Sequence, residues 1–277
     1  MEKRIVLTPV DFTEVSEFAI DHAIHIAMSM DAKVILLHIV KEAGEMKKAK
    51  QMLQVHVDEQ KDKYPDIAIE GVIRIGDIYT DITNAATENN AQIIVMGTHG
   101  LQGFQFITGS RALKVVRDSE IPFLIVQKGA PSFNGYKKIL VPLSLEKDSK
   151  QILSYVKAVA NNFKSKAYIT VPKEKDEFLL NKLKRDLSYS EQFFKDAGIE
   201  FEAHQLEKKN EVDTYIDFAK KYDIDLFVIM NHDDAILPII SNNVQDIITN
   251  KLKIPTLLIN PKSTTNITIF GNYSGGG

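Results

Sequence analysis

A glycine-rich stretch that leads into a predicted helix is the part of this sequence best suited to hold an anion. It reads Gly97-Thr-His-Gly-Leu-Gln-Gly-Phe-Gln-Phe-Ile-Thr-Gly-Ser110. Glycine lets backbone N–H groups approach an anion closely, and a helix N-terminus adds unpaired N–H groups and partial positive charge. The stretch therefore predicts a phosphate-binding loop. Ser110 is either the N-cap of the helix or a hydroxyl that contacts phosphate, and the surrounding glycines favour the phosphate contact.

Other residues capable of chemistry do not form a recognisable catalytic or metal site. The sequence contains no Ser-His-Asp order, Gly-x-Ser-x-Gly elbow, His-Glu-x-x-His motif or Walker A motif, so we predict no catalytic residue. His22 and His25 share a helix face, but no carboxylate repeat accompanies them, and we expect no metal there. His99 recurs as His232 in a second half that lacks the glycines, which favours a structural role.

Short runs rich in Val and Ile alternate with amphipathic stretches, the pattern of strands separated by helices. The predicted strands are Ile5–Val10, Val34–Val40, Ile67–Ile75, Ile93–Met96 and Phe123–Val126. The predicted helices are Glu14–Met30, Ala43–Tyr64, Ile78–Asn89 and Ser110–Asp118. Strands that are apolar on both faces and joined by helices predict a doubly wound α/β fold with an open parallel sheet of five strands. Such sheets bind ligands beyond the carboxyl ends of the strands, here in the loops after strands one and four.

The second half of the chain repeats the first at a shift of 133 residues. Lys3–Pro9 aligns with Tyr136–Pro142, and Ile121-Pro122 aligns with Ile254-Pro255. We therefore predict two tandem sheets: a first domain over residues 1–127, a second over 136–262, and a tail over 263–277. We also expect the two domains to associate as an intrachain pseudo-dimer through their last strands.

Composition excludes several classes of function. The 277 residues carry 34 Lys and Arg against 37 Asp and Glu, which argues against an electrostatic nucleic-acid binder. Cysteine is absent, so thiolate catalysis, disulfides and Cys-type zinc sites are excluded and a reducing cytoplasm is expected. No run approaches the ~18 apolar residues of a membrane span, and the start lacks the pattern of a signal peptide.

Three of these features together resemble the universal stress protein family: Asp11 in a Pro-x-Asp-Phe-Thr turn, Gly97-x2-Gly100, and Gly109-Ser110 before a helix. The resemblance covers both repeats, which suggests a tandem member with the adenine nucleotide alpha-hydrolase-like fold. It implies a stress-response regulatory protein that binds ATP or another adenine nucleotide, with or without Mg²⁺. The binding residues it implies are Asp11, Ile39, Gly76, Gly97, Gly100, Gly109 and Ser110.

Within this resemblance, the glycines and Ser110 would hold the phosphates, Asp11 the nucleoside and the Ile39 backbone the adenine. The family pattern places nine residues between its second and third glycines, whereas eight separate Gly100 from Gly109 here. One missing residue can move an N–H group by up to ~3.5 Å, and Gly103 could absorb the difference.

None of the binding positions recurs in the second domain. The shift of 133 residues replaces them, in order, by Ser144, Pro172, Lys209, Met230, Asp233, Asn242 and Asn243. The second domain is therefore predicted to be degenerate and structural. Two alternatives stay open for the whole chain: a slow ATPase, and an interaction scaffold without nucleotide. A further homodimer of the whole chain is compatible with each of these hypotheses.

Overall fold

The computed structural model describes residues 3–98, 116, 119–143, 151–207, 211–231 and 242–260. The chain divides into two compact units, Met1–Phe133 and Asn134–Gly277. Each unit is considered by itself below, as the first unit and the second unit.

The first unit is built on five parallel strands in the order β3-β2-β1-β4-β5. Their bounds are β1 (Arg4–Pro9), β2 (Ala32–Val40), β3 (Ile69–Ile75), β4 (Ile93–Thr98) and β5 (Phe123–Gln127). Strand order reverses at β1, which lies between β2 and β4. The predicted doubly wound α/β fold is confirmed. The third strand begins two residues later than predicted, because the Ile67 N–H donates to the Tyr64 carbonyl in a turn.

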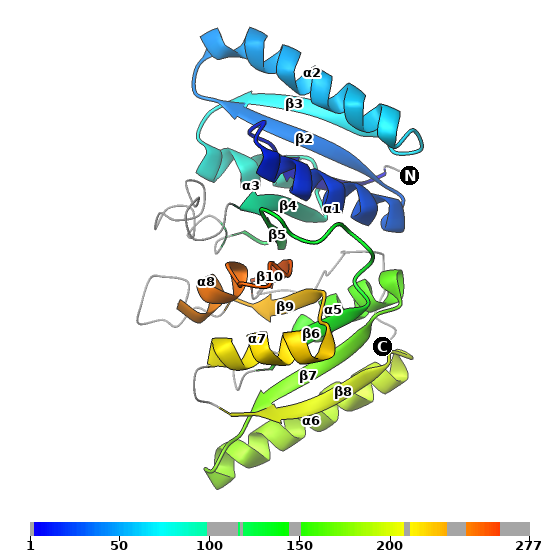
Figure 1. Ribbon diagram of the computed structural model, residues 1–277, viewed down its shortest axis with the longest axis vertical. Helices are drawn as coiled ribbons and strands as arrows, with labels where there is room; N and C mark the ends of the chain where they lie inside the picture. Colours follow the sequence, from blue (N-terminus) through cyan, green and yellow to red (C-terminus); the bar gives the residue numbers. More distant parts are fainter. Residues whose placement is uncertain are drawn as a thin grey trace. The chain divides into compact units, whose positions relative to one another are not determined.

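Helices cover both faces of this sheet. The described helical segments are α1 (Glu14–Met30), a short 3₁₀ turn (Ala43–Glu45), α2 (Met46–Lys63) and α3 (Ile78–Glu88). Figure 1 shows α1 in front of the strands of the first unit and α3 behind them. This placement is what right-handed crossovers require when strand order reverses. The helix predicted over Ser110–Asp118 lies outside the described residues except for Val116, which is buried.

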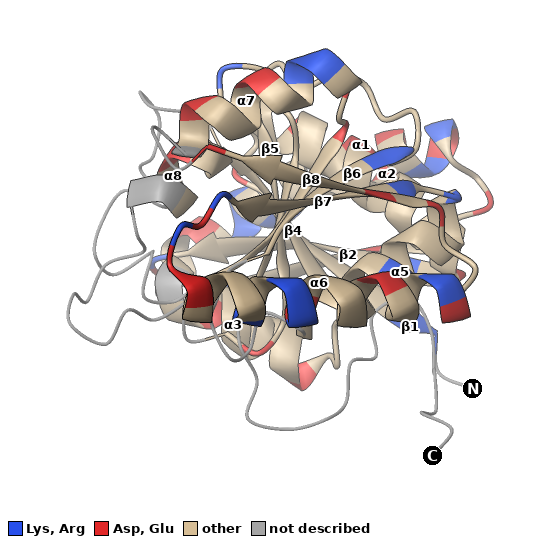
Figure 2. Ribbon diagram, turned by 90° about the horizontal axis from the view of Figure 1, so that it is seen from below, with Lys and Arg blue, Asp and Glu red and all other residues tan. Residues whose placement is uncertain are grey.

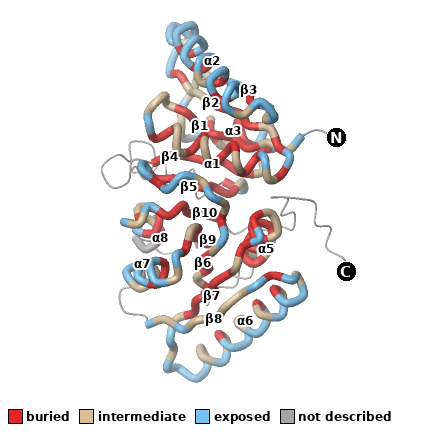
Figure 3. Tube along the Cα trace, turned by 45° about the vertical axis from the view of Figure 1, so that its right-hand side comes forward, coloured by how far each residue is buried: buried red, intermediate tan, exposed pale blue. Residues whose placement is uncertain are grey.

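The core of the first unit consists of aliphatic side chains between the central strands and α1. Val6 and Val95 are fully buried on the face of the sheet that α1 covers, as are Ala19 and Ala23 on α1. Burying a Val, Leu or Ile side chain contributes roughly 1.5–3 kcal/mol, so this layer fixes the height of α1 above the sheet. Figure 3 shows the contrast between the buried central strands and the exposed outer surface of α2.

The second unit repeats this architecture, with strand order β8-β7-β6-β9-β10. Its strands are β6 (Lys138–Pro142), β7 (Lys166–Pro172), β8 (Phe201–Leu206), β9 (Leu226–Met230) and β10 (Thr256–Ile259). Its described helices are α5 (Gln151–Phe163), α6 (Glu177–Asp196), α7 (Glu211–Tyr222) and α8 (Asn242–Ile248). Acidic and basic residues are mixed along α6 (Figure 2), as the near-neutral composition predicts.

The segment before the boundary between the units is bound to α1 and is called the strap here (residues 129–133). The His22 ring donates from Nε2 to the Pro131 carbonyl over 3.3 Å, since a carbonyl can only accept. The Phe133 N–H donates to Asp21 Oδ2 over 3.3 Å, and the Phe133 ring stacks on His25 at 4.8 Å. His22 and His25 therefore hold the strap against α1.

No helix among the described residues is long and apolar enough to cross a membrane.

Candidate functional site

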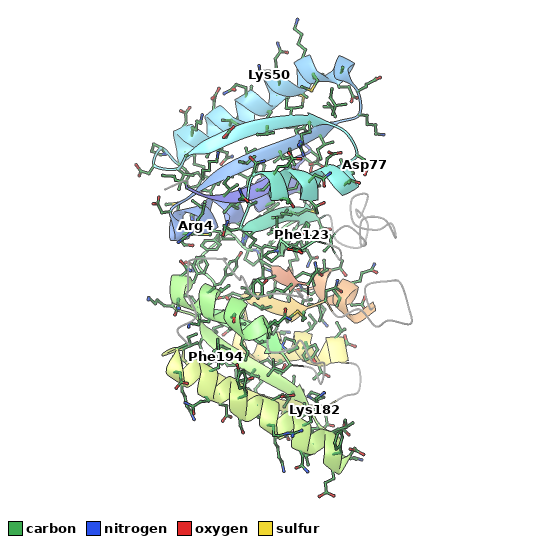
Figure 4. The ribbon with its side chains drawn as sticks, turned by 180° about the vertical axis from the view of Figure 1, so that it is seen from behind. Arg4, Lys50, Asp77, Phe123, Lys182 and Phe194 are labelled. Atoms are coloured by element: carbon green, nitrogen blue, oxygen red, sulfur yellow. The ribbon has the colours of Figure 1, made fainter. Side chains whose placement is uncertain are left out.

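The predicted site residues that the structure describes meet at one edge of the first sheet. Asp11 follows β1, Ile39 is the penultimate residue of β2, Gly76 follows β3 and Gly97 lies in β4. All four are therefore at the carboxyl ends of parallel strands, around the point where strand order reverses. Figure 4 shows Asp77, next to Gly76, at the end of the sheet away from Arg4, where β1 begins. Gly100, Gly109 and Ser110 lie outside the described residues.

Asp11 organises the turn between β1 and α1. Its Oδ1 accepts hydrogen bonds from the Thr13 N–H (3.1 Å), the Thr13 hydroxyl (2.6 Å) and the Ser16 hydroxyl (2.6 Å). The Ser16 hydroxyl in return accepts from the Asp11 N–H over 3.1 Å. Bonds of this kind are stronger than neutral ones because the acceptor is charged. Asp11 thus fixes the start of α1.

The turn is also held from the side by Phe12. This residue has a left-handed backbone (φ 62°), which is uncommon for a non-glycine residue. Its ring contacts His38 of β2 at 4.3 Å and stacks on His56 of α2 at 5.3 Å. His38 Nδ1 donates to the Val10 carbonyl over 2.8 Å, which ties β2 to the same turn. The sequence gives no sign of this role of His38 and His56, because only the fold brings β2 and α2 to Phe12.

His56 is linked in turn to α1. Its Nδ1 lies 3.2 Å from Glu17 Oε1 and 3.9 Å from Glu59 Oε2. The Gln60 amide donates to the other Glu17 oxygen over 3.2 Å. The turn that contains Asp11 is therefore connected to α1 directly and to α2 through Phe12 and His56.

The backbone of Ile39 lies where the hydrogen-bond ladder between β1 and β2 has ended. The last bond of that ladder runs from the Val10 N–H to the Leu37 carbonyl over 2.8 Å. Backbone groups of alternate residues in a strand point to the same neighbour, so those of Ile39 point to the β1 side, as those of Leu37 do. The Ile39 N–H and C=O are therefore the next groups along β2 after the last hydrogen bond to the β1 side. An N–H and a C=O in this position could pair with the edge of a planar ligand.

Gly76 is explained by local structure. Its N–H donates to the Val40 carbonyl over 2.9 Å, and a Cβ at this position would lie 2.1 Å from Asp81 Oδ2. That same oxygen accepts from the Asp77 N–H over 2.8 Å at the start of α3. Glycine leaves room for the Asp81 carboxylate to cap the helix.

Gly97 likewise has a structural reason independent of any ligand. A Cβ on Gly97 would lie 2.7 Å from the Val15 carbonyl oxygen and 2.7 Å from Val15 Cγ1. Real Cβ atoms do not approach a backbone so closely, so glycine is needed where β4 meets the first turn of α1. The sequence predicts only a phosphate contact for Gly97, because the contact with α1 appears only in the folded chain.

Thr98 is a residue of this edge that the sequence analysis overlooked. Its side chain is buried, and its hydroxyl has no hydrogen-bond partner within the described part of the chain. A Thr at a strand end carries no signal of its own in the sequence. Only the folded structure shows that the Thr98 side chain is buried.

Comparisons with known proteins agree with these observations. The model of the universal stress protein family matches residues 3–127. Universal stress protein MJ0531 of Methanocaldococcus jannaschii is 30% identical over 141 residues, which are 46% of this chain and 82% of that protein. The chain belongs to the universal stress protein family. A further member from the same organism, MJ0577, is 25% identical over 152 residues, which are 44% of this chain and 94% of that protein.

Solved universal stress proteins share the fold over nearly the whole chain. A crystal structure from Archaeoglobus fulgidus DSM 4304 has a TM-score of 0.72 at 19% identity and covers 95% of this chain and 100% of that chain. A putative universal stress protein from Pseudomonas aeruginosa UCBPP-PA14 has a TM-score of 0.64 at 15% identity, with 94% of each chain covered. At these identities the comparison shows the fold and leaves the ligand to be argued from the site.

Proposed function

We propose that the first unit binds ATP or another adenine nucleotide, and that this universal stress protein acts as a stress-response regulator that responds to the nucleotide. The observation that carries the proposal is the position of the Ile39 backbone, one step past the end of the β1–β2 ladder and close in the fold to the Asp11 turn. An N–H and a C=O at that position can pair with the adenine edge, while Asp11 accepts from nucleoside hydroxyls.

The phosphates are assigned to the glycine-rich loop. Gly97, Gly100, Gly109 and Ser110 match the residue types of the family pattern, with one residue fewer between Gly100 and Gly109. The loop begins at the end of β4, which is next to β1 in the sheet. Backbone N–H groups and the helix dipole would hold the anion there. Gly76 places the start of α3 at the same edge.

Magnesium would enter this site with the nucleotide. Among the described residues, no group of three His, Asp or Glu side chains could hold a metal ion. Asp11 Oδ1 already accepts three hydrogen bonds within its turn. We therefore propose that Mg²⁺, when present, is bound mainly by the phosphates.

The lack of a metal-binding group of side chains among the described residues also favours nucleotide binding over catalysis. In-line phosphoryl transfer requires a positioned nucleophile in addition to the metal. The Oδ1 of Asp11 accepts three hydrogen bonds within its own turn, and the proposed ligand contact of this carboxylate is with the nucleoside and not with the phosphates. Slow ATP hydrolysis and a scaffold role without nucleotide remain the alternatives that the experiment below separates.

The second unit is proposed to be a structural partner that binds no nucleotide. Pro172 occupies the position of Ile39 and has no N–H to donate. Met230 occupies the position of Gly97 and is buried in β9. Ser144 and Asp233, which replace Asp11 and Gly100, lie outside the described residues. The predicted domain limits, the intrachain pseudo-dimer and a further homodimer stay predictions.

The proposal is tested by finding what the purified protein carries and what it binds. Mass spectrometry of ligand released from fresh protein should detect an adenine nucleotide. Calorimetric titration with ATP should give one site per chain, and incubation with ATP and Mg²⁺ should release little ADP. Rapid release of ADP would instead support an ATPase. If the purified protein carries no nucleotide and also fails to bind added ATP, the result would support the scaffold role.

A further inference from the structure

The sequence contains a single Asn-Gly pair, Asn134-Gly135, directly after the strap. Both residues belong to the second unit, and Asn134 is exposed. Gly135 has a left-handed backbone (φ 79°), which glycine adopts without steric cost. Within the described part of the chain, neither the Asn134 side chain nor the Gly135 N–H forms a hydrogen bond. The side-chain amide and the next backbone nitrogen are therefore both available for reaction.

These two groups can react with one another, and asparagine is among the thermolabile residues of proteins. The Gly135 nitrogen gives up its proton to hydroxide and forms a bond to Asn134 Cγ, while the bond from Cγ to the side-chain nitrogen breaks and ammonia leaves. The product is a succinimide ring. Water opens the ring at either carbonyl, which gives an aspartate or an isoaspartate whose main chain runs through the side-chain carbon. In sum, one amide and one water become one carboxylate and one ammonium ion.

Lys137 places a positive charge beside the peptide that would react. A Cβ on Gly135 would lie 3.0 Å from Lys137 Cε and 3.2 Å from Lys137 Nζ. The ammonium is held in this position because it donates to the Phe163 carbonyl over 3.0 Å. The Lys137 N–H in turn donates to Asp225 Oδ2 over 2.7 Å. A nearby positive charge favours the anionic form of a group, so Lys137 should stabilise the deprotonated Gly135 nitrogen.

The first unit contains an asparagine that the fold protects from the same reaction. Asn90 is also exposed and also lies next to a left-handed turn of the backbone, its own φ being 51°. The nitrogen that would attack its side chain is that of Ala91, whose N–H donates to the Ala86 carbonyl over 2.8 Å. Loss of that proton would break the hydrogen bond. Asn90 is therefore an internal control within the same chain.

We propose that Asn134 is a site of spontaneous deamidation in the folded protein and that Lys137 accelerates the reaction, independently of nucleotide binding. The carboxylate adds one negative charge to a chain whose formal net charge is −3. The isoaspartate product also lengthens the main chain between Phe133, which stacks on His25, and Lys137, which is bound by Asp225. An isoaspartyl carboxylate is the group that isoaspartate methyltransferases modify, so the converted chain is a substrate for that class of enzyme.

The test incubates the folded, full-length protein at mildly alkaline pH. Trypsin cuts after Lys128 and Lys137, so it releases residues 129–137 as one peptide. Mass spectrometry should show this peptide changing from amide to carboxylate with time, while the peptide that contains Asn90 stays unchanged. In urea, which breaks the bond between Ala91 and Ala86, Asn90 should begin to convert as well.

Two reagents detect the intermediate and the product. Hydroxylamine opens a succinimide, so it should cut the folded chain into residues 1–134 and 135–277. An isoaspartate methyltransferase with labelled methyl donor should label the incubated protein and leave fresh protein unlabelled. Asn134→Gln should show neither cleavage nor labelling at this position, because glutamine must close a larger ring and does so far more slowly.

The role of Lys137 is tested with two variants that remove the same charge. Lys137→Gln should slow the conversion of Asn134 by roughly two- to fivefold, because the lost charge is close to the site but open to water. Lys173 follows the end of β7, whereas Lys137 precedes the start of β6, and the two strands are parallel. Lys173→Gln therefore changes the far end of the sheet and should convert at the wild-type rate.

Two results would overturn the proposal in separate parts. If Asn134 stayed an amide in the folded protein and converted only in urea, the fold would protect the pair and the site would be wrong. If Lys137→Gln and the wild type converted at equal rates, the site would stand and the assistance by Lys137 would be wrong. Neither result depends on whether the first unit binds nucleotide.

Discussion

The two units share their framework and differ at the carboxyl edge of the sheet. An ion pair joins the second and third strands in both: Lys33 with Glu70 at 3.0 Å in the first unit, and Lys166 with Glu202 at 2.7 Å in the second. Strand order around the switch point is also the same. Residues that hold the sheet together are therefore matched between the units.

At the carboxyl edge, by contrast, every described position of the predicted site has changed. Ile39 is matched by Pro172, and the glycine that admits α1 is matched by a buried Met230. The buried Thr98 hydroxyl, which has no hydrogen-bond partner among the described residues, is matched by Asn231, whose side chain bonds to Asn260. The comparison shows that the two units keep the same strand order and the same ion pair between strands although the residues at the carboxyl edge differ, among them Gly97, which the first unit needs where β4 meets α1.

Placing Met at position 97 or Gly at position 230 should have the largest effect on the free energy of unfolding. Gly97→Met would place a Cβ 2.7 Å from the Val15 carbonyl oxygen, so β4 or the first turn of α1 must move. We expect a loss of unfolding free energy of about 3 kcal/mol or more. Urea denaturation followed by circular dichroism measures it.

The reverse change, Met230→Gly, removes a side chain that is 7% exposed in β9. It should cost about 2–5 kcal/mol through lost apolar burial and a cavity. If Gly97→Met were as stable as the wild type, the explanation of Gly97 by its contact with α1 would be wrong, and a ligand role would be the better account.

The units should also respond to acid in opposite directions. Burial lowers the pKa of His22 in the first unit, so the stability that this group contributes is present above its ordinary value of 6.5 and is lost as pH falls below it. Burial raises the pKa of Asp225 in the second unit to about 6, against the hydrogen bonds from the Lys138 and Lys137 N–H groups. Protonation of Asp225 is therefore favoured in the folded state, and its contribution to stability falls as pH rises from 3.8 to about 6.

Each response has a variant that should remove it. The Asp225 shift corresponds to about 2–3 kcal/mol over this pH window, and Asp225→Asn should flatten the pH profile of the second unit. Its equivalent in the first unit is Gln92, which does not titrate. His22→Gln should reduce the acid sensitivity of the first unit. Urea unfolding at several pH values, with hydrogen exchange of peptides from each unit as the probe, separates the two; parallel pH profiles would contradict the prediction.

The sequence predicted the strands and helices well because burial on both faces leaves continuous Val and Ile runs, as in Ile93–Met96. It also located Asp11 and Ile39 at strand ends, since parallel strands bring their carboxyl ends to one edge. It could not predict why Gly97 is glycine or how His56 reaches Phe12, because these contacts join segments far apart in the chain. The helix predicted over Ala43–Tyr64 is divided in the structure into a 3₁₀ turn at Ala43–Glu45 and α2 at Met46–Lys63.

Removing the Asp11 carboxylate should have the next largest effect, which is a loss of ATP affinity in the first unit. Asp11→Ala deletes the acceptor of three hydrogen bonds within the turn and the proposed contact with the nucleoside. We expect ATP affinity to fall by about 10- to 150-fold, the equivalent of about 1.5–3 kcal/mol for a bond to a charged group. Calorimetric titration measures it.

Two controls accompany this change. Asp11→Asn retains one oxygen for the turn, so its affinity should lie between those of the wild type and Asp11→Ala. Ser144→Ala, at the aligned position of the second unit, should leave ATP affinity unchanged. A comparable loss in Ser144→Ala would show that the second unit also binds nucleotide, and the asymmetry between the units would be lost.

The smallest expected effect concerns the strap, which is bound to the first unit by different chemistry from that which holds the start of the second unit. In the first unit the Phe133 ring stacks on His25 at 4.8 Å and meets His22 edge-on at 5.5 Å. In the second unit the chain resumes with hydrogen bonds from the Lys137 and Lys138 N–H groups to Asp225. Aromatic contacts contribute about 0.5–1.5 kcal/mol beyond their buried area, so Phe133→Ala should loosen the strap without unfolding α1. Hydrogen exchange should then rise in residues 129–133 and stay unchanged at Lys137 and Lys138, because the latter amides are bound by a carboxylate of the second unit. If hydrogen exchange accelerated equally in residues 129–133 and at Lys137 and Lys138, the strap and the start of the second unit would open together. The contacts of Phe133 and those of Asp225 would then not be independent of one another.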